Sequence, residues 1–91
     1  MDLERQDIHF GGHVQGIGFR YTTQRLAAGF AVTGWVKNLT NGQVHLVVEG
    51  KRSEIKAFLK AIQAEMGPNI DDTQIVLSEY VGQFTGFEIV R

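Results

Sequence analysis

The spacing of apolar residues along this chain changes from a strand-like to a helix-like period and back. The order of these changes restricts the fold more than any other feature of the sequence. Ile8 and Phe10 begin an alternating run, as expected of a half-buried strand, and Val44, Leu46 and Val48 form another. Two longer stretches repeat apolar residues every three or four positions, which is typical of amphipathic helices. Their predicted core-facing residues are Phe19, Thr22, Thr23, Leu26, Ala27 and Phe30 in the first helix, and Ile55, Phe58, Leu59, Ile62 and Met66 in the second.

Local turn and cap residues indicate where these elements end. Gly29 is expected to cap the C-terminus of the first helix, and Ser53 the N-terminus of the second. Asn41-Gly42 predicts a tight hairpin between strands at 34–39 and 44–49, because both positions tolerate positive φ.

The remaining elements follow from the C-terminal third of the chain. A strand is expected at 73–80 and a short terminal strand at 87–90, which gives the order β-α-β-β-α-β plus a fifth short strand. Split βαβ units of this kind build the ferredoxin-like sandwich of the α+β class, with two helices packed on one face of an antiparallel sheet. No repeat, linker or low-complexity segment interrupts the pattern, so residues 1–91 are expected to form a single domain in which 1–6 are frayed.

Composition narrows the class of protein. The 91 residues include no cysteine, which excludes disulfides and thiolate metal sites, and no apolar run is long enough for a transmembrane helix. The N-terminal residues are polar and acidic, unlike a signal peptide. A net charge of −1 argues against a nucleic-acid-binding module. We expect a cytoplasmic monomer that binds neither nucleic acid nor a membrane.

The segment from Gly12 to Arg20 (Gly-His-Val-Gln-Gly-Ile-Gly-Phe-Arg) joins the first strand to the first helix. Gly16 and Gly18 permit backbone angles that other residues avoid, and a helix N-terminus presents unpaired N–H groups to an anion. The forked guanidinium of Arg20 suits phosphate oxygens. The segment therefore predicts a phosphate cradle formed by the backbone N–H groups of Gln15, Gly16, Ile17, Gly18, Phe19 and Arg20.

Taken alone, these glycines are equally consistent with a junction that only serves packing. The segment matches neither a P-loop, which needs a lysine at position 17 or 18, nor the dinucleotide fingerprint, which needs a third glycine at Tyr21. The histidines, His9, His13 and His45, show no metal-binding spacing, and a structural or surface role is favoured for each.

A second segment runs from Gly34 to Val44 (Gly-Trp-Val-Lys-Asn-Leu-Thr-Asn-Gly-Gln-Val) and contains Asn38 near the end of a predicted strand. Its amide can donate and accept hydrogen bonds but cannot act as a base near neutral pH. The simplest interpretation of Asn38 alone is a strand-end residue that hydrogen-bonds to its own turn.

Together, the Gly12–Arg20 segment, Gly34-Trp-Val-Lys-Asn38 and the closing Gly86-Phe-Glu-Ile89 closely resemble the acylphosphatase family over nearly the whole chain. The resemblance implies a ferredoxin-like fold and metal-independent hydrolysis of the carboxyl–phosphate anhydride of acyl phosphates, with no cofactor. It also implies that Arg20 binds the phosphoryl group and that Asn38 orients the attacking water. Inorganic phosphate or sulfate is then expected as a product-like ligand.

The sequence departs from the family pattern at two places. His13 stands where arginine or lysine is common, and the chain ends in Val90-Arg91 without a terminal aromatic residue. The alternative function is a catalytically inactive module of the same fold that binds anions or a partner, and the presence of both Arg20 and Asn38 argues against it.

Overall fold

The computed structural model describes residues 2–91, and Met1 lies outside the described part. The elements are β1 (Leu3–Gly12), α1 (Phe19–Ala27), β2 (Val32–Asn38), β3 (Val44–Lys51), α2 (Arg52–Met66), the 3₁₀ turn η1 (Gly67–Asn69), β4 (Ile70–Ser78) and β5 (Phe87–Val90). In this part of the chain, no helix combines the length and the apolar character needed to span a bilayer.

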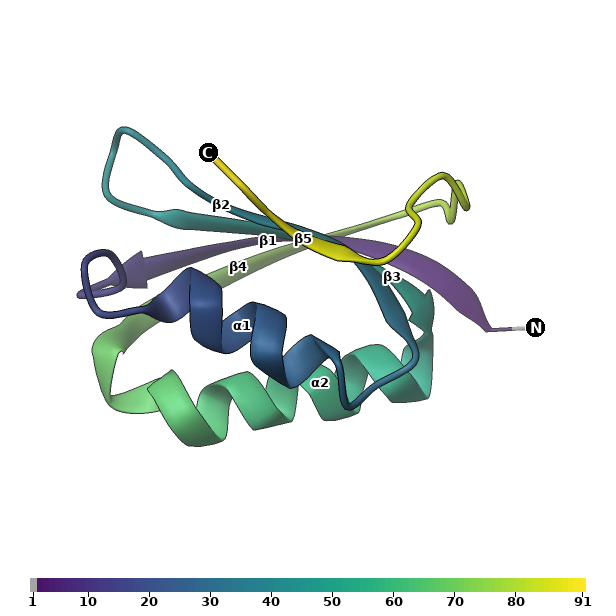
Figure 1. Ribbon diagram of the computed structural model, residues 1–91, viewed down its shortest axis with the longest axis horizontal. Helices are drawn as coiled ribbons and strands as arrows, with labels where there is room; N and C mark the ends of the chain where they lie inside the picture. Colours follow the sequence, from purple (N-terminus) through teal and green to yellow (C-terminus); the bar gives the residue numbers. More distant parts are fainter. Residues whose placement is uncertain (1) are drawn as a thin grey trace.

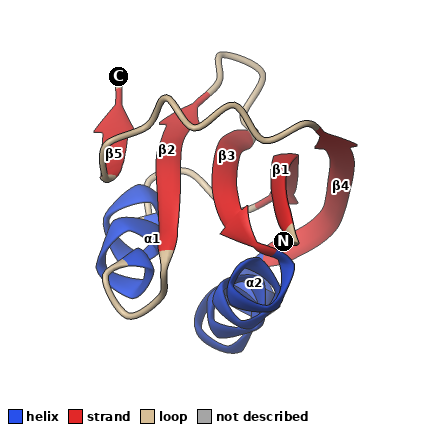
Figure 2. Cartoon of the chain, turned by 90° about the vertical axis from the view of Figure 1, so that its right-hand side faces the viewer, coloured by secondary structure: helices blue, strands red, loops and turns tan. Residues whose placement is uncertain are grey.

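Five strands form one sheet in the order β4-β1-β3-β2-β5, and both helices cover the same face of it (Figure 1; Figure 2). This arrangement confirms the predicted α+β, ferredoxin-like fold. One pairing differs from the expected antiparallel sheet, because β5 runs parallel to β2. After β4, the chain crosses from one edge of the sheet to the other, so that β5 adds to β2 in the same direction and makes the sheet mixed.

The hydrophobic core lies between the sheet and the two helices. Alternate residues of the central strands face the helices, as the sequence pattern predicts, and Ile8, Val44, Leu46 and Val48 are fully buried. The second helix contributes Ile55, Phe58, Ile62 and Met66, and the first contributes Phe19, Thr23 and Ala27. Full burial of one large apolar side chain stabilises the fold by about 1.5–3 kcal/mol, so these stripes fix both helices on the sheet.

Residues 3–6 belong to strand β1, contrary to the expectation that residues 1–6 are frayed, and Met1 lies outside the described residues. Strand β1 begins at Leu3, which pairs with Lys51, and the ladder continues through Gln6, which pairs with Val48. Since β3 extends to Lys51, it offers backbone partners to these residues, and this pairing overrides their polar character.

Three predicted local signals also differ from the structure. Helix α1 ends at Ala27 with Ala28 as its C-cap, and Gly29 does not adopt positive φ. Helix α2 begins at Arg52, so Ser53 lies inside the first turn and makes no capping hydrogen bond. In the hairpin only Gly42 has positive φ, because the connection is a five-residue loop, 39–43, rather than a two-residue turn.

Candidate active site

The loop between β1 and α1, residues 13–18, is called the cradle loop below. Gly16 and Gly18 adopt φ values of 79° and 80°, in the left-handed region that favours glycine. A Cβ at either position would meet no heavy atom within 4 Å, so the space beside the loop is open. Gly18 is the N-cap of α1, and neither a capping side chain nor an acidic residue occupies the first turn.

The N-terminus of α1 has unpaired hydrogen-bond donors. The first helical turn closes with a hydrogen bond from Thr22 N–H to Gly18 O, of 2.9 Å. Within residues 2–91, the backbone N–H groups of residues 15–21 donate no hydrogen bond to another protein group. The helix dipole places partial positive charge at the same end. These groups can therefore bind an anion, as the sequence predicts.

A cavity of about 180 Å³ brings the two predicted catalytic residues together. It is lined by Val14, Gly16, Gly18, Phe19, Arg20, Tyr21, Asn38, Ile89 and Arg91. Arg20 is half-buried and comes from the first turn of α1, whereas Asn38 is the last residue of β2. The lining side chains include no carboxylate and no imidazole, so the charged side chains of the cavity are cationic.

The side chain of Asn38 does not hydrogen-bond to its own turn. Asn38 pairs with the buried Val44 in the β2–β3 ladder, so it lies on the face of the sheet that the helices cover. Its Oδ1 atom is buried and accepts no hydrogen bond from residues 2–91. An unpaired buried acceptor destabilises a fold by about 1–3 kcal/mol, so the predicted hydrogen bond to the turn does not account for the position of this atom.

The side chain of Gln15 connects the cradle loop to the strand end that carries Asn38. Its Nε2 atom donates hydrogen bonds to Leu39 O at 2.7 Å and to Gln43 O at 2.9 Å. The sequence assigned only the backbone of Gln15 to the site. The side chain holds the two halves of the site at a fixed separation, and no spacing rule could reveal this across 24 and 28 residues.

The remaining residues of the Gly12–Arg20 segment differ in burial and in whether they line the cavity. Phe19 is almost fully buried and anchors the start of α1 in the core, while Ile17 packs against the core from the loop. His13 is exposed and does not line the cavity. Arg91, for which no role was predicted, also lines the cavity, because the parallel pairing of β5 with β2 brings the C-terminal residues beside Asn38.

Comparison with known proteins agrees with this geometry. The acylphosphatase family model matches residues 6–89. A curated acylphosphatase of Syntrophus aciditrophicus is 34% identical over 91 residues, covering 97% of this chain and 93% of the relative.

Two solved structures share the fold along nearly the whole chain. The crystal structure of acylphosphatase from Bacillus subtilis has a TM-score of 0.85 and 30% identity, covering 98% of this chain and 99% of that one. Full-length HypF in its phosphate- and nucleotide-bound form has a TM-score of 0.84 and 29% identity, covering 98% of this chain but only 12% of HypF. The sequence match over nearly the whole chain and the shared fold together establish that this chain belongs to the acylphosphatase family.

Proposed function

We propose that this acylphosphatase hydrolyses the carboxyl–phosphate anhydride bond of acyl phosphates, without a metal ion, and that Arg20 and Asn38 are its catalytic residues. One observation carries the assignment of roles. A single cavity is bordered by the N–H groups at the start of α1, by the guanidinium of Arg20 and by Asn38, whose buried oxygen has no protein partner. The chain is proposed to act as one catalytic domain.

The phosphoryl group is proposed to bind at the cradle loop. Backbone N–H groups of residues 15–20 would hold its non-bridging oxygens, and Arg20 would add paired, charge-assisted hydrogen bonds. The open space beside Gly16 and Gly18 supports this placement, since no side chain competes for it. Inorganic phosphate and sulfate share this charge and shape, so both are proposed ligands of the same loop.

The chemical step needs positioning and charge stabilisation more than acid–base catalysis, because the departing carboxylate is a good leaving group. Asn38 is proposed to hold a water molecule in line with the leaving group. The water oxygen forms the new bond to phosphorus while the bond from phosphorus to the acyl oxygen breaks. The lining side chains include no carboxylate and no imidazole, and a phosphate oxygen is therefore the proposed acceptor of the proton.

The alternative is an inactive module that binds anions or a partner through the same loop. Such a module would need the N–H groups and Arg20, but it would gain nothing from a buried, unpaired Asn38 Oδ1. The cost of that unpaired acceptor favours the enzyme. Location in the cytoplasm and a monomeric state, with no nucleic-acid or membrane partner, are further proposals that follow from the composition of the chain.

A hydrolysis assay separates the two functions. The purified protein should release inorganic phosphate from acetyl phosphate and not from a simple phosphomonoester, which lacks the carboxylate leaving group. Added phosphate should inhibit competitively, and EDTA should leave the rate unchanged. Phosphate binding without turnover would support the inactive module, and loss of activity in EDTA with recovery in Mg²⁺ would contradict the metal-independent step.

A further inference from the structure

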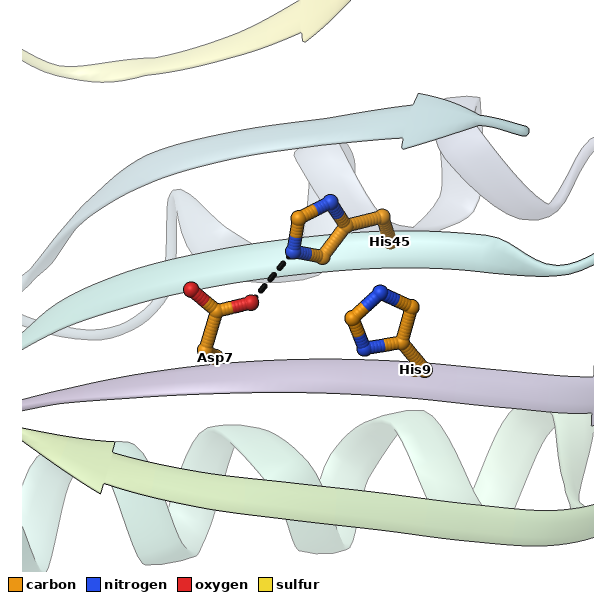
Figure 3. Close-up of side chains that lie close together, drawn as sticks. All are labelled: Asp7, His9 and His45. Atoms are coloured by element: carbon orange, nitrogen blue, oxygen red, sulfur yellow. Dashed lines mark hydrogen bonds and ion pairs between the residues drawn. The ribbon is translucent and has the colours of Figure 1, made fainter.

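The face of the sheet that points away from the helices carries a group of three polar side chains. Asp7 and His9 flank the buried Ile8 on β1, and His45 lies between the buried Val44 and Leu46 on β3. Because side chains alternate along a strand, all three project from the outer face of the sheet. Figure 3 shows them together over the two neighbouring strands.

The register of the sheet determines this grouping. His9 pairs directly with His45 in the β1–β3 ladder, which places their Cβ atoms about 4.5–5.5 Å apart. Their rings are stacked, with centroids 4.2 Å apart and planes 15° from parallel. The carboxylate of Asp7 contacts Nε2 of His45, as the dashed line in Figure 3 marks. One ligand atom from each residue lies within 4.8 Å of the other two.

We propose that Asp7, His9 and His45 form a binding site for a divalent transition-metal ion of the Zn²⁺ class. Two imidazoles and one carboxylate are the donor set that such ions prefer, whereas Mg²⁺ and Ca²⁺ favour sites made of oxygen atoms. Ligand bonds of about 2.0–2.2 Å require donor atoms roughly 3–3.5 Å apart. Binding therefore requires the three side chains to rotate about their own bonds until the donor atoms converge on one ion.

The hydrogen bonding of the group points to a ligand as well as to an ion pair. Asp7 and His45 satisfy each other, but the ring of His9 makes no hydrogen bond to another residue in the range 2–91. A metal ion would take the place of the proton between Asp7 and His45 and would use the free nitrogen of His9 as its third ligand. Water completes the coordination, because the site opens to solvent on this face.

An aromatic and an apolar side chain pack beside the group. Trp35 lies edge-on to His45, with ring centroids 4.8 Å apart and an interplanar angle of 81°. Val47, on the same outer face, is almost fully buried and provides an apolar floor beside Asp7. The polar neighbours across the ladders are Lys37 opposite His45 and Gln74 opposite His9. Two cations lie near the group on this face. Lys37 has a flexible side chain that can turn toward solvent, and Arg5, two residues before Asp7 on β1, packs over the ring of Phe84.

This site is separate from the proposed active site. Asn38 lies on the helix-covered face of the sheet, whereas the Asp7–His9–His45 group lies on the opposite face. The ion would therefore connect the central strands β1 and β3 and stabilise the fold without entering the hydrolytic step. Its binding is independent of the function proposed above, and hydrolysis that resists EDTA is compatible with it.

Direct binding measurements test the proposal. Calorimetric titration of the chelator-treated full chain with ZnCl₂ should give one ion per chain, and the melting temperature should rise with the logarithm of the free Zn²⁺ concentration above the dissociation constant. Co²⁺ should bind the same site and give visible absorption bands that Zn²⁺ abolishes, and millimolar Mg²⁺ should not compete. A wild-type chain that binds no Zn²⁺ would overturn the proposal.

Variants locate the ion. Asp7→Asn, His9→Gln and His45→Gln should each weaken Zn²⁺ binding by at least about tenfold, the lower limit for loss of a group that supports a metal site. The matched control is His13→Gln, which removes an exposed histidine outside the group and should keep wild-type affinity. Circular dichroism verifies folding, and the nearly isosteric Asp7→Asn keeps the test decisive if a histidine variant unfolds. Equal affinity in wild type and all three cluster variants would refute the site.

Discussion

The cradle loop and the hairpin loop, residues 39–43, both depend on glycines at positive φ, but they use their backbone differently. In the hairpin loop, Leu39 N–H donates to Gln43 O at 2.9 Å and Gly42 N–H donates to Leu39 O at 3.2 Å. Gln43 N–H donates to Oδ1 of Asn41 at 3.0 Å. In the cradle loop, the N–H groups of residues 15–18 have no hydrogen-bond partner within the described chain.

The two loops differ in whether their backbone N–H groups are paired. A loop that pairs its own N–H groups serves as a structural connection. A loop that leaves several N–H groups unpaired at a helix N-terminus can donate them to a bound anion. The hairpin loop also supports the cradle loop, because its carbonyls at Leu39 and Gln43 accept the hydrogen bonds of the Gln15 side chain. Glycine content alone does not distinguish the two.

The largest expected effect comes from removing the cation beside the cradle loop. Arg20→Ala should lower kcat/KM by about 2–4 kcal/mol of transition-state stabilisation, or roughly 30- to 1,000-fold, because a charge-assisted contact to the phosphoryl group is lost. It should also raise the inhibition constant of inorganic phosphate. The matched control is Arg25→Ala on the same helix, which removes an exposed ion pair with Glu65 and should change neither quantity by much. Equal effects of the two variants would contradict the assignment of Arg20.

Asn38→Ala should lower kcat severely and leave phosphate inhibition nearly unchanged. The N–H groups and Arg20 remain in place to hold phosphate, while the water loses the group proposed to orient it. Steady-state kinetics with phosphate as inhibitor measures both quantities, after melting curves have established that the variant is folded. If folded Asn38→Ala keeps near-normal turnover, or loses phosphate as Arg20→Ala does, the proposed division of roles is wrong.

A matched pair of glycine variants, one in each loop, separates loss of stability from loss of phosphate binding. Gly18 and Gly42 have φ values of 80° and 93°, and a Cβ at either would meet no atom within 4 Å. Gly18→Ala and Gly42→Ala should therefore destabilise the fold by similar amounts, about 1–2 kcal/mol each, from the strained conformation alone. Only Gly18→Ala should also weaken phosphate binding, since it adds a methyl group to the space beside the cradle loop. Thermal melts and phosphate titration test the pair, and loss of phosphate binding in both variants would remove the distinction.

The smallest expected effect lies outside both loops. Hydrogen bonds from Gln6 and then from Arg52 lower the pKa of Glu4 from its usual value of 4.5. The charged form of Glu4 therefore contributes stability that is fully present above pH 4.5 and is lost as the pH falls through the lowered pKa. Urea unfolding at a series of pH values should show a shallower acid decline for Glu4→Gln, with phosphate affinity at neutral pH unaffected. An unchanged pH profile would exclude this contribution.

Several features could be predicted because they depend on residues close together in sequence. The apolar stripes of both helices, the alternating strands and the turn at Gly16 and Gly18 are local patterns, and the structure confirms the elements that they predict. Arg20 was predicted from its place beside the glycine turn, whereas the role of Asn38 came only from the resemblance between segments; the fold places both on one cavity. Predictions from local signals were wrong where a segment pairs with a distant strand. Residues 3–6, expected to be frayed, pair with β3 as far as Lys51.

The sequence by itself determined the order of the elements, the face that each buries and the backbone freedom of the cradle loop, because periodicity and glycine conformation act within a few residues. Only the tertiary structure decided which distant groups meet. It joined Gln15 to the hairpin loop, brought Arg91 beside Asn38 through the parallel strand β5, and set His9 against His45 in the β1–β3 register. The physical reason is that strand pairing connects residues through chain reversals whose partners and register depend on packing of the whole sheet, which no local spacing encodes.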